Sequence, residues 1–270
     1  MRLRLFLMAA GLLVTAAVSG KHTHAADLPT ADKFDLYLLI GQSNMAGRGA
    51  LPKEPQSAPE RILKFSQENT WIAGTEPLHF DKPTIVGAGL GLSFAQEMAT
   101  ADPSVTIGLI PCAVGGTPLS RWEKGGDLYQ QAVERAKQAM AAGKLKGILW
   151  HQGEGDAGAK ETAESYAARL KAMVVALREE LDAPDVPFVA GELGQFYLVE
   201  NGGKAVYAKL VNEQINALPQ QLPHSAVASS EGLGHKGDAV HFDTAALREF
   251  GLRYAAAMKD LQKPHGTHSR

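Results

Sequence analysis

The stretch Asp35-Leu-Tyr-Leu-Leu-Ile-Gly-Gln-Ser-Asn-Met-Ala-Gly-Arg-Gly49 joins a short apolar run to a glycine-rich polar turn. The run from Leu36 to Ile40 is continuously apolar, which is typical of a strand buried on both faces of a parallel sheet. Gly41 would end this strand. Ser43 would then lie just beyond its carboxyl end, where open α/β sheets bind their ligands. Serine also caps helices, so this stretch alone leaves Ser43 as either a functional hydroxyl or an N-cap.

The amino terminus has the order of a secretory signal. Two arginines precede an apolar stretch over residues 5–18, and small residues follow, as in signal peptides. We assign residues 1–26 to such a signal, with cleavage after Gly20 or Ala25, and expect export to the periplasm or the exterior. The apolar stretch is short for a spanning helix, although an uncleaved anchor stays open.

The composition of the remaining chain is that of one globular domain. The 270 residues are 45% hydrophobic and 21% charged, which is enough apolar material for a core. We place this domain at residues 27–263 and a polar tail at 264–270. A net charge of -2 shows no basic excess, so no nucleic-acid partner is expected. The sequence contains no second apolar segment of spanning length, so we expect no stable membrane insertion after cleavage. Cys112 is the only cysteine, which excludes an intramolecular disulfide.

Short apolar strands alternate with helical segments along the domain. This alternation predicts a three-layer α/β/α architecture, a parallel sheet of about five strands with helices on both faces. Residues 61–66 and those around Trp71 also predict a small hairpin that decorates the sheet. The five strands are expected at 36–40, 105–110, 147–150, 187–193 and 225–229, and the main helices at 127–142, 161–181, 205–218 and 244–261. The glycine-rich segment at 87–95 is expected to lead into a further helix that runs to about Thr100.

A polar turn precedes the last helix. Asp238 and His241 are separated by two residues, and Asp243 is a natural N-cap for the helix that follows. A turn can bring the Asp238 carboxylate onto Nδ1–H of the imidazole, which leaves the other ring nitrogen pointing outward. If that nitrogen meets Ser43, the imidazole accepts the hydroxyl proton during attack on a carbonyl. Ser43, Asp238 and His241 are therefore the candidate catalytic residues.

A Gly-Gly pair follows the strand at 105–110. Gly115 and Gly116 do not resist a positive φ angle, so they can turn a backbone N–H towards an anion. This turn is either half of an oxyanion hole or an ordinary glycine turn.

Polar residues near the third strand end allow two further interpretations. His151, Glu154 and Asp156 combine an imidazole with two carboxylates, but no second histidine stands at a recognised metal-binding spacing. We therefore assign no metal site. Arg48 and Trp122 lie near the expected strand ends, and each either contacts sugar or serves the fold.

Four blocks of the sequence together resemble carbohydrate esterase family 6. The family joins acetyl xylan esterases and sialate O-acetylesterase relatives within the SGNH hydrolases, whose fold is a flavodoxin-like α/β/α sandwich. The resemblance covers nearly the whole chain after the signal. The blocks are Gly41–Gly49, Pro111–Thr117, Trp150–Glu154 and Asp238–His241, in the family's order.

The resemblance implies a role for each matching residue. Ser43 would be the nucleophile, His241 the base and Asp238 its carboxylate partner. An oxyanion hole would be formed by the N–H of Ser43, the N–H of Gly116 and the side chain of Gln152.

Two positions in the third block need separate treatment. Glu154 matches a second acidic residue that has been considered as a partner of the histidine in similar enzymes, so it stays open as the alternative acid. The loop spacing ranks Asp238 first. His151 stands where relatives often carry an aromatic residue, and it is not assigned a catalytic role.

These observations predict a secreted serine esterase that removes O-acetyl groups from carbohydrate, acetylated xylan or a related plant polysaccharide first, and needs no cofactor. A sialate O-acetylesterase is the alternative with the same chemistry. An inactive carbohydrate-binding protein on an esterase fold is the alternative of another class, and the intact Ser43, Asp238 and His241 argue against it. The sequence does not indicate an oligomeric state.

Overall fold

The computed structural model describes residues 28–54, 58–200, 202–203 and 205–263. The expected signal peptide at 1–26 and the polar tail at 264–270 lie outside these described residues. Among the helices of the described part, none is both long and apolar enough to cross a membrane.

The chain forms one sheet of seven strands in the order β3-β2-β4-β1-β5-β6-β7. All neighbouring strands are parallel except β2 and β3, which form an antiparallel hairpin. The strands are β1 Phe34–Gly41, β2 Ile62–Phe65, β3 Trp71–Ala73, β4 Thr106–Pro111, β5 Lys144–His151, β6 Phe188–Gly191 and β7 Ser225–Ala228.

The expected count of five strands is wrong because the hairpin belongs to the sheet. Leu63 and Lys64 of β2 pair in parallel with Gly108 and Leu109 of β4. This pairing extends the sheet by two strands at one edge. The five strands expected from apolar runs are all present, so the error lies in treating the hairpin as decoration.

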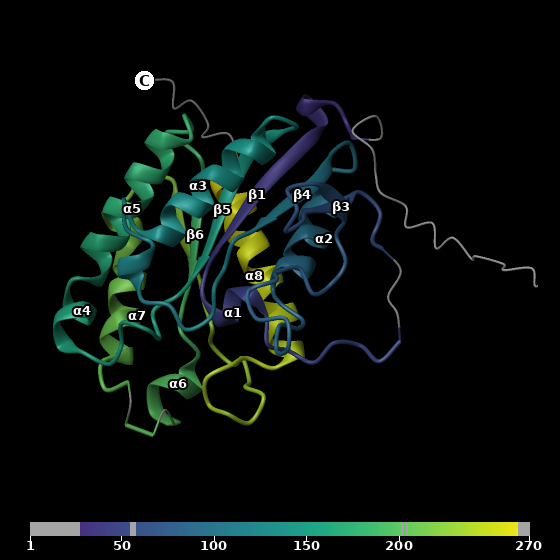
Figure 1. Ribbon diagram of the computed structural model, residues 1–270. Helices are drawn as coiled ribbons and strands as arrows, with labels where there is room; N and C mark the ends of the chain where they lie inside the picture. Colours follow the sequence, from purple (N-terminus) through teal and green to yellow (C-terminus); the bar gives the residue numbers. More distant parts are fainter. Residues whose placement is uncertain (1–27, 55–57, 201, 204, 264–270) are drawn as a thin grey trace, which may run out of the picture.

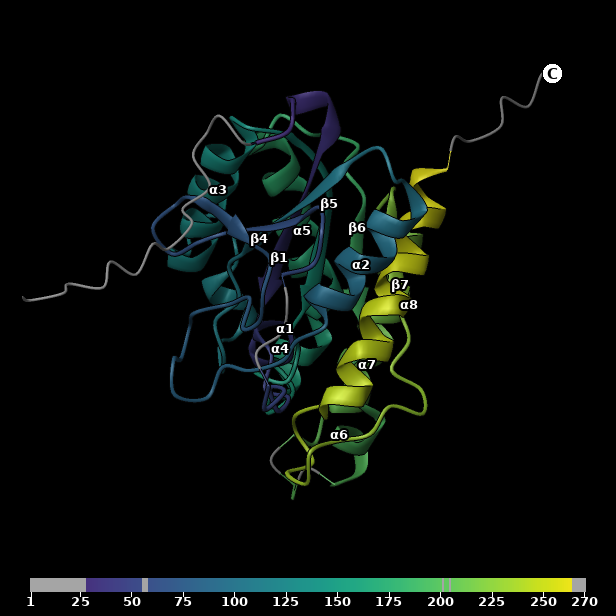
Figure 2. The ribbon, with the colours of Figure 1, turned by 90° about the vertical axis from the view of Figure 1, so that its right-hand side faces the viewer.

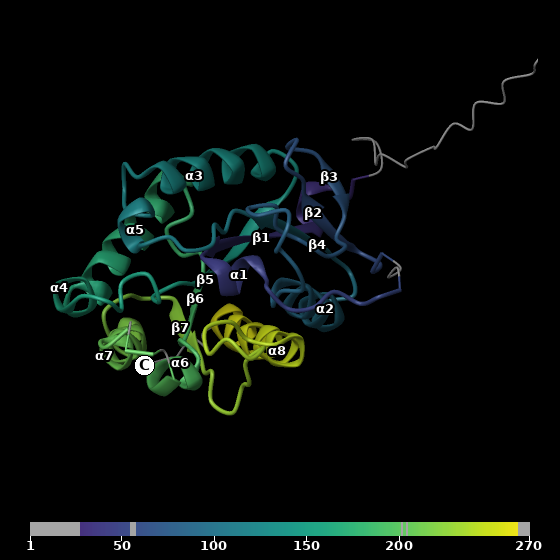
Figure 3. The ribbon, with the colours of Figure 1, turned by 60° about the horizontal axis from the view of Figure 1, so that its bottom comes forward.

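Helices cover both faces of the sheet, which confirms the three-layer architecture. Helices α3 and α5 lie on one face and α2 and α8 on the other (Figure 3). Helices α2 and α8 run side by side (Figure 2). The predicted helix at 161–181 is interrupted at Ser165 and forms two helices. The helices are α1 Ser43–Ala46, α2 Gly91–Ala101, α3 Asp127–Met140, α4 Lys160–Glu164, α5 Tyr166–Glu180, α6 Gln195–Glu200, α7 Ala208–Ala217 and α8 Thr244–Gln262.

Strand β1 lies in the interior of the sheet, between β4 and β5. Side chains on both of its faces are buried, among them Leu36, Leu38 and Leu39. Each such leucine stabilises the fold by about 1.5–3 kcal/mol relative to an exposed one. The continuous apolar run therefore forms the centre of the core, as its sequence predicts.

Gly41 ends β1 in a conformation that only glycine adopts easily. Its φ is 129°, and a Cβ at this position would overlap the carbonyl oxygen of His151 on β5. The close approach allows Gln42 N–H to donate to His151 O at 2.8 Å, and Val114 N–H donates to Gly41 O at 3.0 Å. The turn is thus held by both neighbouring strand ends, which places α1 and Ser43 at the carboxyl edge of the sheet (Figure 1).

Candidate active site

The structure brings Ser43, His241 and Asp238 together. Oγ of Ser43, in the first turn of α1, lies 3.0 Å from Nε2 of His241. Nδ1 of the same ring lies 2.7 Å from Oδ2 of Asp238. A neutral imidazole held in this way carries its proton on Nδ1 and offers the Nε2 lone pair to the serine hydroxyl. The arrangement can therefore remove a proton from Ser43.

The loop before α8 is shaped by its own side chains. Oδ1 of Asp238 accepts the backbone N–H of Val240 at 3.0 Å and that of His241 at 2.8 Å. Ala239 adopts a left-handed φ of 55°, and its N–H donates to Nδ1 of His235 at 3.0 Å. Burial raises the pKa of Asp238, but hydrogen bonds from the backbone and ring of His241 lower it by more, so the pKa is about 2. The carboxylate therefore stays ionised beside the imidazole at neutral pH.

The Gly-Gly turn lies against Ser43 and is held by Asp81. The N–H of Gly115 donates to Oδ2 of Asp81 at 2.8 Å. A Cβ on Gly115 would lie 3.3 Å from Cβ of Ser43, so the turn and the serine are in close contact. Gly116 has a φ of 77°, a left-handed conformation that favours glycine. The side chain of Asp81 thus fixes the turn whose next N–H, that of Gly116, is the expected oxyanion donor.

Arg48 is part of this support. Its Nη2 lies 2.7 Å from Oδ2 of Asp81, and its Nη1 donates to Gly47 O at 2.7 Å. The Arg48 and Asp81 side chains are only 3% and 1% exposed. Burial raises the pKa of Asp81, but the hydrogen bonds from Arg48 and from Gly115 N–H, together with the charge of Arg48, outweigh it, so the pKa lies below its usual value. Of the two interpretations left open for Arg48, its burial and its pairing with Asp81 support the one in which it serves the fold.

Gln152 does not contribute to an oxyanion hole. Its Nε2 donates to Thr117 O at 3.1 Å and to Oδ2 of Asp156 at 2.7 Å. Its Oε1 accepts the hydroxyl of Tyr166 at 2.8 Å. Both amide hydrogens are occupied in a fully buried network, which leaves none for a bound oxyanion. The role that the resemblance implied for Gln152 is therefore contradicted.

Trp122 belongs to the core. It is 1% exposed, and its Nε1–H donates to Oγ1 of Thr117 at 3.1 Å. Its ring packs edge-on against Trp150 with centroids 5.6 Å apart. Of the two interpretations left open for Trp122, its burial supports the one in which it serves the fold.

Glu154 and Asp156 have separate structural partners. Oε1 of Glu154 accepts Nδ2–H of Asn44 at 2.6 Å. The carboxylate that contacts Nδ1 of His241 is that of Asp238. Asp156 accepts Leu119 N–H at 2.8 Å and pairs with Arg169 at 3.1 Å. Across the described ranges, no group of three or more His, Cys, Asp or Glu side chains is arranged to hold a metal ion.

Two residues that support the site were not assigned from the sequence. Asn44 directly follows Ser43 in the sequence, and this adjacency is the one signal that could have pointed to it. The structure shows that the side chain of Asn44 is buried beside the site. Asp81 lies in a segment without a recognisable pattern, so no sequence signal points to it.

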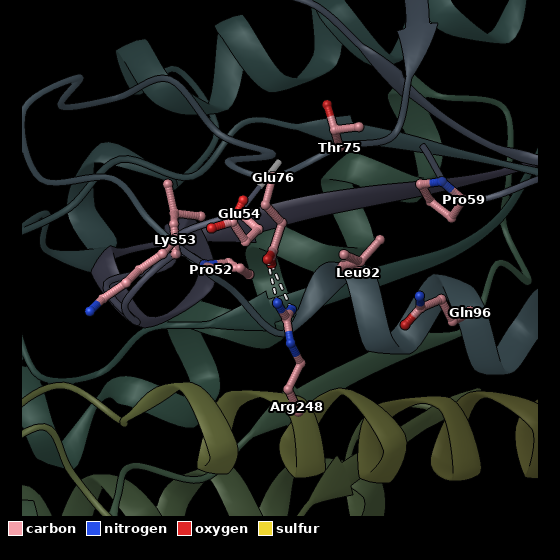
Figure 4. A pocket seen from close by; sticks show the side chains of 10 residues that line it. Pro52, Lys53, Glu54, Pro59, Thr75, Glu76, Leu92, Gln96 and Arg248 are labelled. Atoms are coloured by element: carbon pink, nitrogen blue, oxygen red, sulfur yellow. Dashed lines mark hydrogen bonds and ion pairs between the residues drawn. The ribbon is translucent and has the colours of Figure 1, made fainter. Parts of the chain in front are cut away.

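A separate cavity of about 320 Å³ lies beside α2 and α8. Arg248 and Glu76 form an ion pair in its wall (Figure 4). None of its lining residues belongs to the group formed by Ser43, Asp238 and His241. It is lined by Leu51, Pro52, Lys53, Glu54, Pro59, Thr75, Glu76, Leu92, Gln96 and Arg248.

Comparison with known proteins shows to which family the chain is similar. The family described as "Carbohydrate esterase, sialic acid-specific acetylesterase" matches residues 33–260. A probable carbohydrate esterase from Arabidopsis thaliana is 34% identical over 241 residues, which are 82% of this chain and 89% of the plant protein. The X-ray structure of that plant protein superimposes with a TM-score of 0.76 at 30% identity, covering 86% of this chain and 99% of the other.

More distant structures share the fold. NanS is 19% identical with a TM-score of 0.71, over 86% of this chain and 98% of NanS. A carbohydrate acetylesterase from Xanthomonas citri is 23% identical with a TM-score of 0.66, over 84% of this chain and 56% of that chain. At these identities the likeness concerns the fold alone.

Proposed function

This chain belongs to the family of carbohydrate esterases and sialic acid-specific acetylesterases, and we propose that it is an exported serine esterase that removes O-acetyl groups from carbohydrate. The resemblance recognised from the four sequence blocks is thereby confirmed, as is the SGNH-type α/β fold that it implies. The observation that carries the proposal is the contact of 3.0 Å between Oγ of Ser43 and Nε2 of His241, with Asp238 on the far side of the ring.

In the proposed reaction, Ser43 attacks the carbonyl carbon of the acetyl ester. Nε2 of His241 takes the hydroxyl proton as the new C–O bond forms, and Asp238 stabilises the imidazolium. The tetrahedral intermediate then collapses, the sugar oxygen leaves with the proton from His241, and acetyl-Ser43 remains. A water molecule repeats the sequence, donates its proton to His241 and releases acetate with Ser43 restored.

The oxyanion of the intermediate is proposed to bind two backbone N–H groups. The N–H of Ser43 lies in the first turn of α1, where helix geometry provides no backbone acceptor. The N–H of Gly116 follows the amide of Gly115 that Asp81 holds. Removing one such donor typically costs about 10²–10³ in turnover, so the support that Asp81 gives to this turn bears on the rate.

Acetylated xylan, or a related plant polysaccharide, is the first proposed substrate. A sialate ester is the second, and one observation favours it besides the family's description. Nζ of Lys82 lies 3.8 Å from the position that a Cβ on Gly116 would occupy. A positive charge therefore borders the proposed oxyanion turn, where it suits a sugar that carries a carboxylate.

The decisive experiment compares the purified protein with its Ser43→Ala variant on a small chromogenic acetate ester. We expect turnover by the native protein and none by a folded Ser43→Ala. Acetate release from acetylated xylan and from O-acetylated sialic acid is then measured side by side to rank the two substrates. Sugar binding without hydrolysis by the native protein would favour a carbohydrate-binding role instead.

Export is proposed from the residues at 1–26 and is tested separately. Expression of the full chain in a bacterium, followed by fractionation and amino-terminal sequencing, should give a shortened protein outside the cytoplasm. A full-length cytoplasmic product would contradict export and leave the esterase proposal unaffected.

A further inference from the structure

A buried histidine and a buried carboxylate lie next to the triad without belonging to it. His151, at the end of β5, is fully buried, and the Glu154 side chain is 5% exposed. Nε2 of His151 lies 3.7 Å from Oε1 of Glu154. Nε2 of His151 and Oε2 of Glu154 are buried without a hydrogen-bond partner among the described residues. An ionised carboxylate in such a place requires a compensating charge.

The hydroxyl of Tyr254 shows how the ring of His151 is protonated. This hydroxyl donates its single hydrogen to Trp150 O at 2.7 Å. Its oxygen, 3.3 Å from Nδ1 of His151, can therefore only accept, so Nδ1 carries a hydrogen. A lone pair on Nε2 would face the carboxylate and repel it. A hydrogen on Nε2 would remove this repulsion across the 3.7 Å that separate Nε2 from Oε1 of Glu154.

The environment of Glu154 supports its ionised form. Burial raises the pKa of Glu154, but the adjacent His151 and the Asn44 amide lower it more, so the pKa lies below its ordinary value. The negative charge of Glu154 therefore persists in the core, beside the ring of His151.

Asn44 connects this pair to the catalytic loop. Its Nδ2 donates to Oε1 of Glu154 at 2.6 Å and to Val240 O at 3.1 Å, while its Oδ1 accepts Phe242 N–H at 3.2 Å. The carboxylate can only accept, so it requires the N–H₂ end of the amide, in the same orientation that Val240 O and Phe242 N–H require. The amide in turn holds the peptide groups on both sides of His241.

We propose that Glu154, neutralised by His151, is a positioning residue that orients Asn44 and thereby aims His241 at Ser43. Glu154 acts through Asn44 and not on the imidazole of His241, whose Nδ1 is occupied by Asp238. This inference rests on the proposed roles of Ser43 and His241 in ester hydrolysis.

The first test compares Glu154→Gln with Glu154→Ala on the chromogenic acetate. In Glu154→Gln the amide oxygen still accepts from Asn44, and the amide N–H₂ faces a neutral His151. We expect this variant to keep kcat within about threefold, because the hydrogen bond that orients Asn44 survives. Glu154→Ala should lose about 10- to 100-fold in kcat with KM little changed, as expected for a misplaced catalytic group. If Glu154→Ala does not fold, Glu154→Met, which fills the volume, takes its place.

The second test is a double-mutant cycle between Asn44→Ala and Glu154→Ala. If Glu154 acts through Asn44, the double variant loses no more kcat than Asn44→Ala alone. Arg178→Met is the matched control. The buried Arg178 also makes three hydrogen bonds, to the carbonyls of Val186, Pro223 and His224, but these lie at the amino ends of β6 and β7, away from the carboxyl ends that carry the site. This control should lower stability and leave kcat per folded molecule unchanged.

The third test concerns the charge of the pair. His151→Leu leaves the Glu154 carboxylate buried without a counter-charge, so kcat and the unfolding temperature should both fall. The double variant His151→Leu/Glu154→Gln removes that charge, so it should regain part of the lost kcat and part of the lost unfolding temperature. The absence of any such recovery would contradict the neutralising role of His151.

Each outcome separates this inference from the esterase proposal. Additive losses in the cycle, or a Glu154→Gln variant as damaged as Glu154→Ala, would overturn the positioning role. Wild-type kcat in both Asn44→Ala and Glu154→Ala, with an inactive Ser43→Ala, would also overturn it and leave the esterase intact. Full turnover by Ser43→Ala would instead remove the proposed function itself.

Discussion

Asp238 binds His241 twice: one carboxylate oxygen accepts the backbone N–H at 2.8 Å, and the other lies 2.7 Å from Nδ1 of the ring. The carboxylate therefore shapes the loop and selects the tautomer of the imidazole at the same time. Substitutions at this position can separate the two effects.

Asp238→Asn should preserve the conformation of the loop before α8 and lower the rate of ester hydrolysis. The amide oxygen still accepts from the backbone, but the N–H₂ group faces Nδ1 and moves the ring proton to Nε2, which can then no longer accept from Ser43. We expect kcat to fall by about 10²–10⁴ with little change in the unfolding temperature. Asp238→Ala should lose stability as well. A nearly active Asp238→Asn would contradict the role of Asp238.

Acid pH should affect stability through Asp238 only below about pH 4. Its pKa is about 2 in the folded protein because hydrogen bonds from His241 outweigh the opposing effect of burial. The ordinary value is about 3.9, so the stabilisation is complete above that pH and is lost as the pH falls towards 2. Urea titrations of the native protein and Asp238→Asn should therefore converge in stability over this interval. Equal stability differences at every pH would contradict this assignment.

The same pKa predicts the shape of the pH–rate profile. Asp238 takes up no proton between about pH 4 and neutrality, so it contributes no step to the profile there. A plot of log kcat/KM against pH should fall on the acid side with a slope of about one. A slope of two would show that a second group of the relay titrates in the same range.

Gly41→Ala should push the ends of β1 and β5 apart, and so destabilise the fold. A Cβ at Gly41 would overlap His151 O, and its φ of 129° is unfavourable for alanine. Since backbone cannot yield as a side chain does, we expect a loss of more than about 3 kcal/mol in the free energy of unfolding. Chemical denaturation measures this loss. Gly202→Ala is a control for the φ effect alone, because Gly202 has a φ of 65° and an added Cβ would meet no atom within 4 Å.

Asp81→Ala should cost more than the double variant Arg48→Met/Asp81→Leu. The single change leaves the Arg48 guanidinium buried without its partner, which typically costs about 3–5 kcal/mol. The double change removes both charges and should recover much of this stability. Thermal unfolding checks this order. Both variants should also lose kcat, because Gly115 N–H loses the acceptor that holds the oxyanion turn.

Lys82→Gln distinguishes the two proposed substrates. Because Lys82 borders the Gly116 turn, its ammonium should lower the KM of a carboxylate-bearing sugar and have little effect on a neutral ester. We expect a several-fold rise in KM for O-acetylated sialic acid, in line with about 1 kcal/mol for an exposed charge pair, and no change for the chromogenic acetate. An equal effect on both substrates would argue against this role of Lys82.

The position of the candidate site was predictable because strand ends of a parallel sheet meet at one edge. The apolar run at Leu36–Ile40 placed Ser43 at this edge, and the spacing of Asp238 and His241, with the resemblance of the four blocks, led us to expect that Ser43 and His241 meet. The N-cap at Asp243 was also predictable from its residue type, and its carboxylate does accept Ala246 N–H at 2.8 Å.

The direction in which buried side chains point was not predictable. Gln152 stands in the expected turn, but its amide turns inward because Thr117, Asp156 and Tyr166 offer it three hydrogen bonds. A sequence block specifies the residue and not its rotamer. The burial of Trp122 was not predictable for a related reason. A large ring near a strand end lies in the core or on the surface according to what packs over it.

The parallel pairing of β2 was equally hidden in the sequence. Its four residues show hairpin alternation with β3, but the partner on the other side, β4, lies more than forty positions along the chain. Local pattern predicts the hairpin, and only packing of the whole domain selects the edge on which it is placed.

Ser43 and His241 are 198 positions apart, which gives the site a place in the order of folding. Contacts of such long range form slowly, because the entropy of closing a long loop is lost before any contact compensates for it. During synthesis, the first strand of the sheet is made long before the loop that carries His241. Ester hydrolysis should therefore be the last native property to appear on refolding, and its recovery reports that the two distant parts of the domain have joined.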